Sequence, residues 1–137
     1  MLRFDFVLTE NNLKEKVYEI GAQIKEHWTS KEITIKHLSG GTTNSLCACH
    51  LSTMPWNNND TILFRIYGLH TEEFISRTDE VTNMVAMKKI GLGPKIYGQF
   101  ANGICYELLS GEILSQADAA DDHIFPMVTI FGMFFFY

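Results

Sequence analysis

The chain has 137 residues, of which 46% are hydrophobic and 20% charged, and its formal net charge is −5. The length suits one compact unit, and the composition argues against a disordered chain. Because nucleic-acid binding needs a basic patch and none is visible, the acidic balance argues against that class of protein as well.

The first part of the chain predicts a helix followed by a pair of strands. Apolar residues recur at helical spacing from about Asn12 to Trp28, which predicts the first helix. Ile33 and Ile35 then alternate with polar residues, as in a half-buried strand. The turn Ser39–Gly41 leads from this strand into a returning strand at Ser45–Leu51.

The middle of the chain predicts a third strand and a second helix. After a polar loop, Thr61–Tyr67 is rich in the β-branched and aromatic residues that favour strands. Residues Thr71–Ile90 then switch to helical periodicity. Thr71 is the expected N-cap of this helix, and Gly91 is the expected stop.

Two further short strands are predicted at Lys95–Phe100 and Ile104–Leu109. The dipeptide Asn102-Gly103 lies between them and is a strong hairpin signal. The order of helix, three strands, helix and two strands predicts an α+β fold. We expect a five-stranded antiparallel sheet with one helix packed on it and an additional amino-terminal helix.

Cysteine content and the two ends of the chain bear on its compartment. The odd number of cysteines does not suggest a disulfide framework, and no second ligand pair suggests zinc, so we expect buried thiols at Cys47, Cys49 and Cys105. Asp5 interrupts the first residues, which therefore do not resemble a secretory signal. The apolar stretch Ile124–Tyr137 is shorter than the roughly 20 residues of a membrane-spanning helix. We expect a cytoplasmic chain without a membrane span.

Three features that can carry chemistry occur in the order found in kinases. The glycine turn Gly40–Asn44 can cradle a phosphate with consecutive backbone N–H groups, or it is a plain hairpin turn. Arg65 lies among apolar residues of a strand, where it either holds nucleotide phosphates or faces solvent. Asp79 and Glu80 lie on the following helix, where a carboxylate either pairs with the strand cation or is simply solvated. The combination favours a kinase-like nucleotide site.

The stretch from about Leu38 to Glu112 resembles the choline/ethanolamine kinase family. The resemblance covers over half of the chain and is closer to the ethanolamine branch than to the choline branch. It rests on SGGTTNSL at Ser39–Leu46, LFRIYG at Leu63–Gly68, Thr71-Glu72, DEV at Asp79–Val81, and GPKIYGQFANGICYELLSGE at Gly93–Glu112. It implies the fold of a protein-kinase-like amino-terminal lobe.

The resemblance also implies roles for individual residues in ATP binding. The phosphate loop would consist of Gly40, Gly41, Thr42, Thr43 and Asn44. Arg65 would stand in the place of the strand lysine of protein kinases, and Glu80 would be its partner on the helix. In the linker between lobes, the Glu107 carbonyl and the Leu109 amide would hold the adenine edge. Because the backbone makes that contact, side-chain identity would matter less there.

The sequence contains no counterpart of the family's catalytic loop. Phosphoryl transfer needs a carboxylate to accept the substrate proton and groups to hold Mg²⁺. The resemblance implies that an H-x-D…N loop and a later aspartate supply both, together with the aminoalcohol pocket, in a second lobe. No histidine of this sequence starts an H-x-D…N pattern, and His123 lacks the downstream residues. We therefore expect no catalytic residue and no metal ligand in this chain.

The sequence divides into residues 1–112, expected to form the kinase-like lobe, and residues 113–137, expected to be a divergent tail. The apolar tail would leave exposed phenylalanines in a lone lobe, as in an alternative or truncated isoform. The first function hypothesis is the ATP-binding half of an ethanolamine kinase that acts in phosphatidylethanolamine synthesis and is inactive alone. The alternatives are a non-catalytic binding or regulatory fragment that keeps weak nucleotide affinity or pairs with a full-length enzyme, and a non-functional truncated product.

Overall fold

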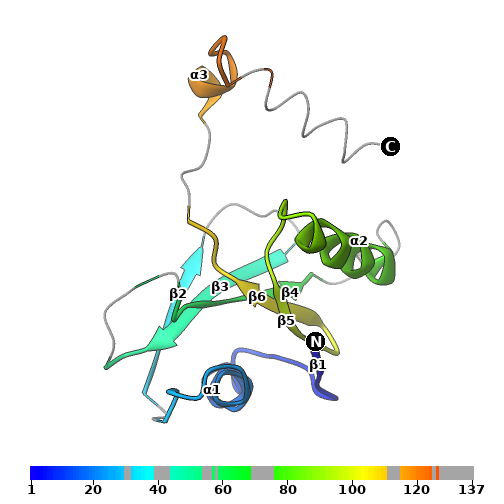
Figure 1. Cartoon of the computed structure of the whole chain (residues 1–137). Helices are drawn as coiled ribbons and strands as arrows, with labels where there is room; N and C mark the ends of the chain where they lie inside the picture. Colours follow the sequence, from blue (N-terminus) through cyan, green and yellow to red (C-terminus); the bar gives the residue numbers. More distant parts are fainter. Residues whose placement is uncertain are drawn as a thin grey trace.

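A computed structural model describes residues 1–29, 32–38, 44–53, 57, 59–68, 76–110, 115–124 and 126. Among these residues, a six-stranded sheet has the order β1-β5-β6-β4-β3-β2 (Figure 1). The strands are β1 Leu2–Arg3, β2 Ile33–Leu38, β3 Asn44–Leu51, β4 Ile62–Tyr67, β5 Ile96–Phe100 and β6 Gly103–Glu107. The helices are α1 Leu13–Ile24, α2 Arg77–Lys89 and the short α3 Gln116–Ala119.

The five predicted strands are β2 to β6, and their pairing is antiparallel as expected. The structure adds β1, which pairs parallel with β5 through Leu2 opposite Gly98 and Arg3 opposite Gln99. Beyond β1, the backbone N–H of Leu8 donates to the Asn102 side chain, whose amide donates back to the Leu8 carbonyl, both at 2.8 Å. The amino-terminal segment is therefore tied to the β5–β6 hairpin.

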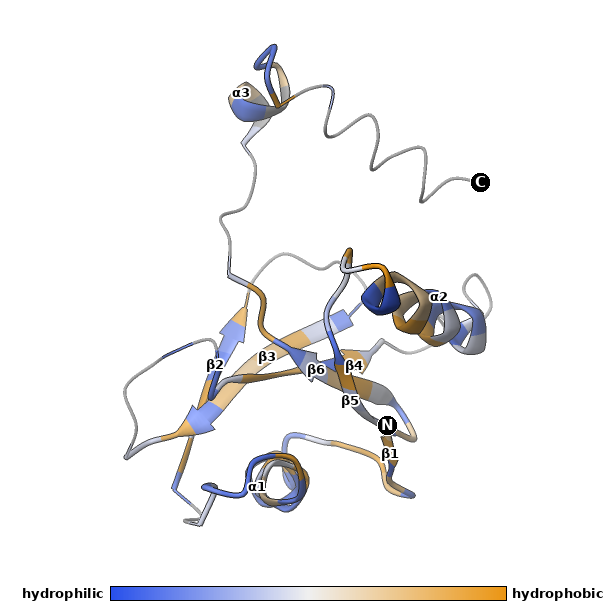
Figure 2. Cartoon of the chain, viewed as in Figure 1, coloured by the Kyte–Doolittle hydropathy of each residue, from blue (hydrophilic) through white to orange (hydrophobic). Residues whose placement is uncertain are grey.

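The two longer helices cover opposite faces of the sheet, and each face has its own apolar core (Figures 1 and 2). Val17 and Ile20 of α1 are buried against Cys47, Phe64 and other residues on one face. On the other face, the buried residues are Val81 of α2, Ile96 and Ile104. Since successive strand residues point to opposite faces, neighbouring residues of one strand serve different cores.

Helix α1 is shorter than the sequence predicts. It ends at Ile24, because Lys25 adopts an extended conformation as its C-cap. Trp28 is nevertheless only 2% exposed. A Cβ atom added to Gly21 would lie 1.9 Å from the Trp28 ring, so the indole packs directly on the helix backbone at this glycine. The apolar spacing that suggested a longer helix therefore reflects burial rather than helical backbone.

Helix α2 has well-formed caps at both ends. Its N-cap is Ser76, whose hydroxyl accepts a hydrogen bond from the Asp79 backbone N–H. The predicted N-cap, Thr71, lies outside the described residues and is wrong for this helix, because the Ser76 hydroxyl caps its first turn. The predicted stop is confirmed: Gly91 has a φ of 78°, and the Leu92 N–H donates to the Met87 carbonyl at 2.9 Å. This pattern is a Schellman motif, which favours glycine at this position.

Candidate functional site

Arg65 lies in the centre of the sheet and points to the face covered by α2. In β4, Phe64 belongs to the core under α1, so Arg65 and Tyr67 face the other way. Leu46 is directly opposite Arg65 on β3, and Ile104 is opposite it on β6. Strand pairing on both sides therefore fixes the backbone position of Arg65, from which the guanidinium group extends.

Glu80 meets Arg65 from the first turn of α2. An Arg65 Nη atom donates to the Glu80 Oε1 atom at 2.6 Å, and the two side chains are 26% and 17% exposed. The Glu80 backbone N–H donates to the Ser76 carbonyl, so the capped start of α2 sets the position of this carboxylate. The expected pairing of the strand cation with the helix carboxylate is present.

Two more residues complete this cluster. An Arg77 Nη atom donates to the second Glu80 oxygen at 3.0 Å. The Arg77 guanidinium carbon also lies 3.9 Å from the centroid of the Tyr67 ring. The sequence reasoning missed Arg77 and Tyr67, although the spacing of Arg77 three residues before Glu80 is a recognisable signal for a helical ion pair.

Burial of Tyr67 and Tyr106 gives this cluster a partly apolar surrounding. Burial raises the pKa of the Tyr67 phenol, and the nearby Glu80 carboxylate raises it further. Burial likewise raises the pKa of Tyr106 on β6. Both phenols are therefore neutral at physiological pH, so the charges of this cluster come from the carboxylate and the guanidinium groups.

A cavity of about 390 Å³ lies next to the Arg65–Glu80 pair. Apart from that pair, its lining is largely apolar and comes from α2 and the segment that follows it. The described lining residues are Arg65, Glu80, Asn83, Met84, Met87, Leu92, Gly93 and Pro94. Methionine side chains adapt to different shapes, so this wall can accept an apolar group beside the charged pair.

On the face of the sheet that carries Arg65, the neighbouring residues of β3 and β4 are apolar. Ala48 on β3 is opposite Leu63 on β4, and both are buried. Residues directly opposite each other in an antiparallel pair share a face, and Leu63 lies two residues before Arg65. Leu46, Ala48 and Leu63 therefore form an apolar strip that leads up to the guanidinium.

Three of the other predicted site residues, Asn44, Glu107 and Leu109, lie among the described residues. Gly40, Gly41, Thr42 and Thr43 lie outside the described residues. Asn44 begins β3 and is opposite Tyr67, so the end of that turn reaches the strand that carries Arg65. Glu107 ends β6, and Leu109 follows it with 53% of its surface exposed.

The Glu107 side chain has more contacts than the sequence suggests. Its Oε2 atom accepts the Lys95 backbone N–H and the Lys88 Nζ, each at 2.9 Å. These bonds join the end of β6 to the end of α2 and the start of β5. The hydrogen bond from the Lys95 backbone, followed by that from Lys88, lowers the pKa of this carboxyl below its usual 4.5. The Glu107 side chain therefore has a structural role of its own, beside the backbone contact that the sequence predicts.

Replacing Glu107 by Gln should lower the melting temperature at neutral pH. A pKa that is lower in the folded state contributes stability above the unfolded-state value and loses it as pH falls through the folded-state value. The difference between wild type and variant should therefore be constant near neutral pH and shrink below pH 4.5. Thermal unfolding monitored by circular dichroism checks this, with the exposed Glu26→Gln as the control. If the difference in melting temperature grew on acidification, the hydrogen bonds that Glu107 accepts from Lys95 and Lys88 would not be its source.

Among the described residues, neither the cysteines nor the acidic and histidine side chains form a second candidate site. The three cysteines are buried and free, as expected. Burial raises the pKa of Cys49, and it raises that of Cys105 to about 12, so neither is a reactive thiolate. The structure describes no group of three or more His, Cys, Asp or Glu residues that could hold a metal ion. No described helix is both long enough and apolar enough to span a membrane.

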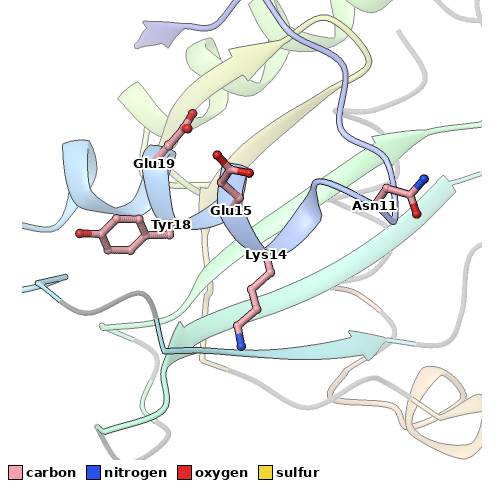
Figure 3. A pocket seen from close by; sticks show the side chains of 5 residues that line it. All are labelled: Asn11, Lys14, Glu15, Tyr18 and Glu19. Carbon is pink, nitrogen blue, oxygen red and sulfur yellow. The ribbon is translucent and has the colours of Figure 1, made fainter.

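A second cavity, of about 470 Å³, lies along α1 (Figure 3). Its described lining comes from α1 and from Asn11, two positions before the helix: Asn11, Lys14, Glu15, Tyr18 and Glu19. The charges along it have both signs, and α1 packs on the face of the sheet opposite to Arg65. This cavity is therefore separate from the Arg65 cluster.

Known proteins with similar sequences are kinases of small alcohols. The chain is 32% identical over 120 residues to ethanolamine kinase 1 of Mus musculus, covering 87% of this chain and 32% of that protein. It is 32% identical over 127 residues to probable choline kinase 2 of Arabidopsis thaliana, covering 85% of this chain and 36% of that protein. The chain thus spans about a third of the length of these curated relatives.

Solved structures agree with this similarity. The choline kinase of Cryptosporidium parvum superposes with a TM-score of 0.62 at 26% identity, covering 80% of this chain and 31% of that one. An ethanolamine kinase of Plasmodium vivax has the same TM-score at 22% identity, which shows the shared fold, and covers 79% of this chain and 27% of that one. Residues 35–130 match the family described as choline/ethanolamine kinase. The chain belongs to the choline/ethanolamine kinase family and corresponds to the amino-terminal part of its members.

Proposed function

We propose that residues 1–112 are the ATP-binding lobe of an ethanolamine kinase of the cytoplasm and that residues 113–137 are a separate tail. The observation that carries this proposal is the Arg65–Glu80 pair, at 2.6 Å, on the face of the sheet covered by α2. A guanidinium held by a carboxylate is oriented before its ligand arrives, and its planar fork of donors suits phosphate oxygens. ATP would lie on this face, with its phosphates at Arg65 and at the turn Gly40–Asn44.

The adenine end of ATP suits the apolar strip of this face. Leu46, Ala48 and Leu63 offer the flat apolar contact that a purine ring needs. The backbone of Glu107 and Leu109 would supply the hydrogen bonds to the adenine edge. Ionised Glu107 keeps the end of β6 attached to α2 and β5, which holds this backbone in place.

The family also implies Mg²⁺, whose role is to neutralise charge on the transferred phosphoryl group. The described residues offer no acidic cluster for it, and Glu80 already accepts from two arginines. Within this chain we therefore assign no Mg²⁺ ligand, no catalytic base and no ethanolamine site. These groups would come from a second lobe, and the chain alone would bind ATP without transferring phosphate.

Nucleotide binding by the purified chain tests this proposal. We expect a fluorescent ATP analogue to bind and to be displaced by ATP, and Arg65→Met to weaken binding about tenfold or more, since a hydrogen bond to a charged group contributes about 1.5–3 kcal/mol. Lys14→Met, which removes an exposed cation from α1 on the opposite face of the sheet, is the matched control. Equal binding by wild type and Arg65→Met would reject the assigned site.

The second expected result is the absence of turnover. With ethanolamine and Mg²⁺ present, the chain should consume no ATP above background, because it lacks the proton acceptor that phosphoryl transfer needs. A coupled assay for ADP release measures this. Robust turnover that disappears in Gly41→Val would show that the chain carries its own catalytic groups.

A non-catalytic binding fragment is the alternative function. It is favoured by one sequence observation, the lack of any H-x-D…N pattern in the 137 residues. Such a fragment would pair with a full-length enzyme. Size-exclusion chromatography of the chain mixed with a complete ethanolamine kinase distinguishes the two readings, since only the fragment hypothesis requires a stable complex.

A further inference from the structure

Arg77 occupies an unusual place for a basic residue. It is the first residue of α2, directly after the N-cap Ser76. A cation at this end of a helix opposes the helix dipole, and the first turn favours acidic residues instead. The stability of α2 by itself therefore does not account for this arginine.

Arg77 contacts the Arg65–Glu80 pair. Its guanidinium reaches Glu80 Oε2 at 3.0 Å, while Arg65 holds Oε1 of the same carboxylate at 2.6 Å. The two arginines thus fix both oxygens of Glu80, one from α2 and one from β4. The Arg77 side chain is only 13% exposed, so these contacts are shielded from solvent.

Tyr67 gives Arg77 a direct contact with the strand. The Arg77 guanidinium carbon lies 3.9 Å from the centroid of the Tyr67 ring. Tyr67 follows Arg65 by two residues on β4, so both side chains project from the same face of the strand. A guanidinium stacked on a partly desolvated ring is attracted by it, and this contact attaches the start of α2 to β4.

We propose that Arg77 is a positioning residue that holds α2 against β4 and so forms the Arg65–Glu80 pair before any nucleotide binds. Within the proposed function, it would prepare Arg65 for the phosphates without touching them. Arg77 makes two contacts of different chemistry: an ion pair to Glu80 and a ring contact to Tyr67. Conservative variants can therefore separate them.

The experiment uses the 137-residue chain and two readouts. The first is the side-chain Nε–Hε NMR signal of Arg65, assigned by its loss in Arg65→Lys, which reports the pair without nucleotide. The second is ATP affinity, measured by displacement of a fluorescent analogue. Arg77→Ala should shift and broaden the Arg65 signal and weaken ATP binding about tenfold, as expected for a lost charge-assisted contact. Arg77→Lys, which keeps the charge but loses the planar fork, should give a smaller effect on both.

Tyr67 and Lys89 supply the controls. Among the described residues, the Tyr67 hydroxyl has no hydrogen-bond partner. Tyr67→Phe should therefore leave both readouts unchanged, whereas Tyr67→Leu should act like Arg77→Ala. Lys89→Ala removes an exposed cation from the other end of the same helix and should change neither readout.

The outcomes separate this proposal from the proposed function. An Arg65 signal that is the same in Arg77→Ala and wild type overturns the positioning role, even if the melting temperature falls. If wild type binds no ATP but Arg77→Ala disturbs the Arg65 signal, the positioning role stands and the nucleotide assignment fails. If Arg77→Ala disturbs the signal and weakens ATP binding while Lys89→Ala does neither, both stand.

Discussion

Replacing Trp28 by Ala is expected to lower the free energy of unfolding by about 3–5 kcal/mol, the usual cost of removing a large buried aromatic side chain. Trp28 is 2% exposed and belongs to the core that α1 forms with the sheet. The neighbouring Gly21 has no side chain that could move in to fill the space. The cavity would therefore persist, and a loss of this size is a large part of the stability of a small domain.

Urea unfolding followed by far-ultraviolet circular dichroism measures this loss. Trp28→Phe should cost less than Trp28→Ala, because it keeps most of the ring and removes an indole N–H that has no hydrogen-bond partner in the described part of the chain. Ile90→Ala is the control, since Ile90 is 60% exposed and should change stability little. Equal effects of Trp28→Ala and Ile90→Ala would contradict the burial of the indole.

Replacing Glu80 by Ala is expected to destabilise the chain by about 2–3 kcal/mol. The change removes an acceptor of two charge-assisted hydrogen bonds and leaves the Arg65 and Arg77 guanidinium groups close together in a partly buried site. Like charges in such surroundings repel each other, so the start of α2 should loosen. The loss should be larger than that of Arg77→Ala, which leaves one complete ion pair.

Thermal and urea unfolding check the Glu80 result. Asp79→Ala is the matched control, because Asp79 is the adjacent carboxylate, is exposed, and lies in the same turn of α2. It should cost only a few tenths of a kcal/mol through the helix dipole. If the two variants lose the same stability, the network around Glu80 contributes nothing beyond a favourable helix charge.

The strands and the two main helices could be predicted because their signals are local. Apolar periodicity places α1 and α2, and β-branched or aromatic runs place β4, β5 and β6. The strand β1 could not be predicted, since two residues carry no period and the pairing of Leu2 with Gly98 depends on the finished sheet. Trp28 follows the helical spacing although the helix has already ended before it. Apolar spacing therefore predicts which residues are buried more directly than it predicts which residues are helical.

At the candidate site, the sequence indicates the residues that a known arrangement of kinases requires. Arg65 and Glu80 could be named because their order along the chain is that of a strand cation and a helix carboxylate. The spacing of Arg77 and Glu80 offered a local signal that was missed. The contact between Arg77 and Tyr67 could not be predicted, since it depends on the rotation of α2 relative to β4, which no local pattern encodes. The Glu107 side chain was missed for the same reason, because its partners are brought together by the packing of α2 beside β5 and β6.

The attachment of the amino-terminal segment to Asn102 has a consequence for synthesis on the ribosome. Leu8 and Asn102 are 94 positions apart, so residues 1–8 cannot take their native place until nearly the whole sheet has left the exit tunnel. The β2–β3–β4 strands, by contrast, pair with near neighbours in sequence and can associate earlier. Contacts of long sequence separation form late because loop closure must be achieved first. This segment would thus remain unattached on the nascent chain, exposed to chaperones and proteases, until the β5–β6 hairpin is complete.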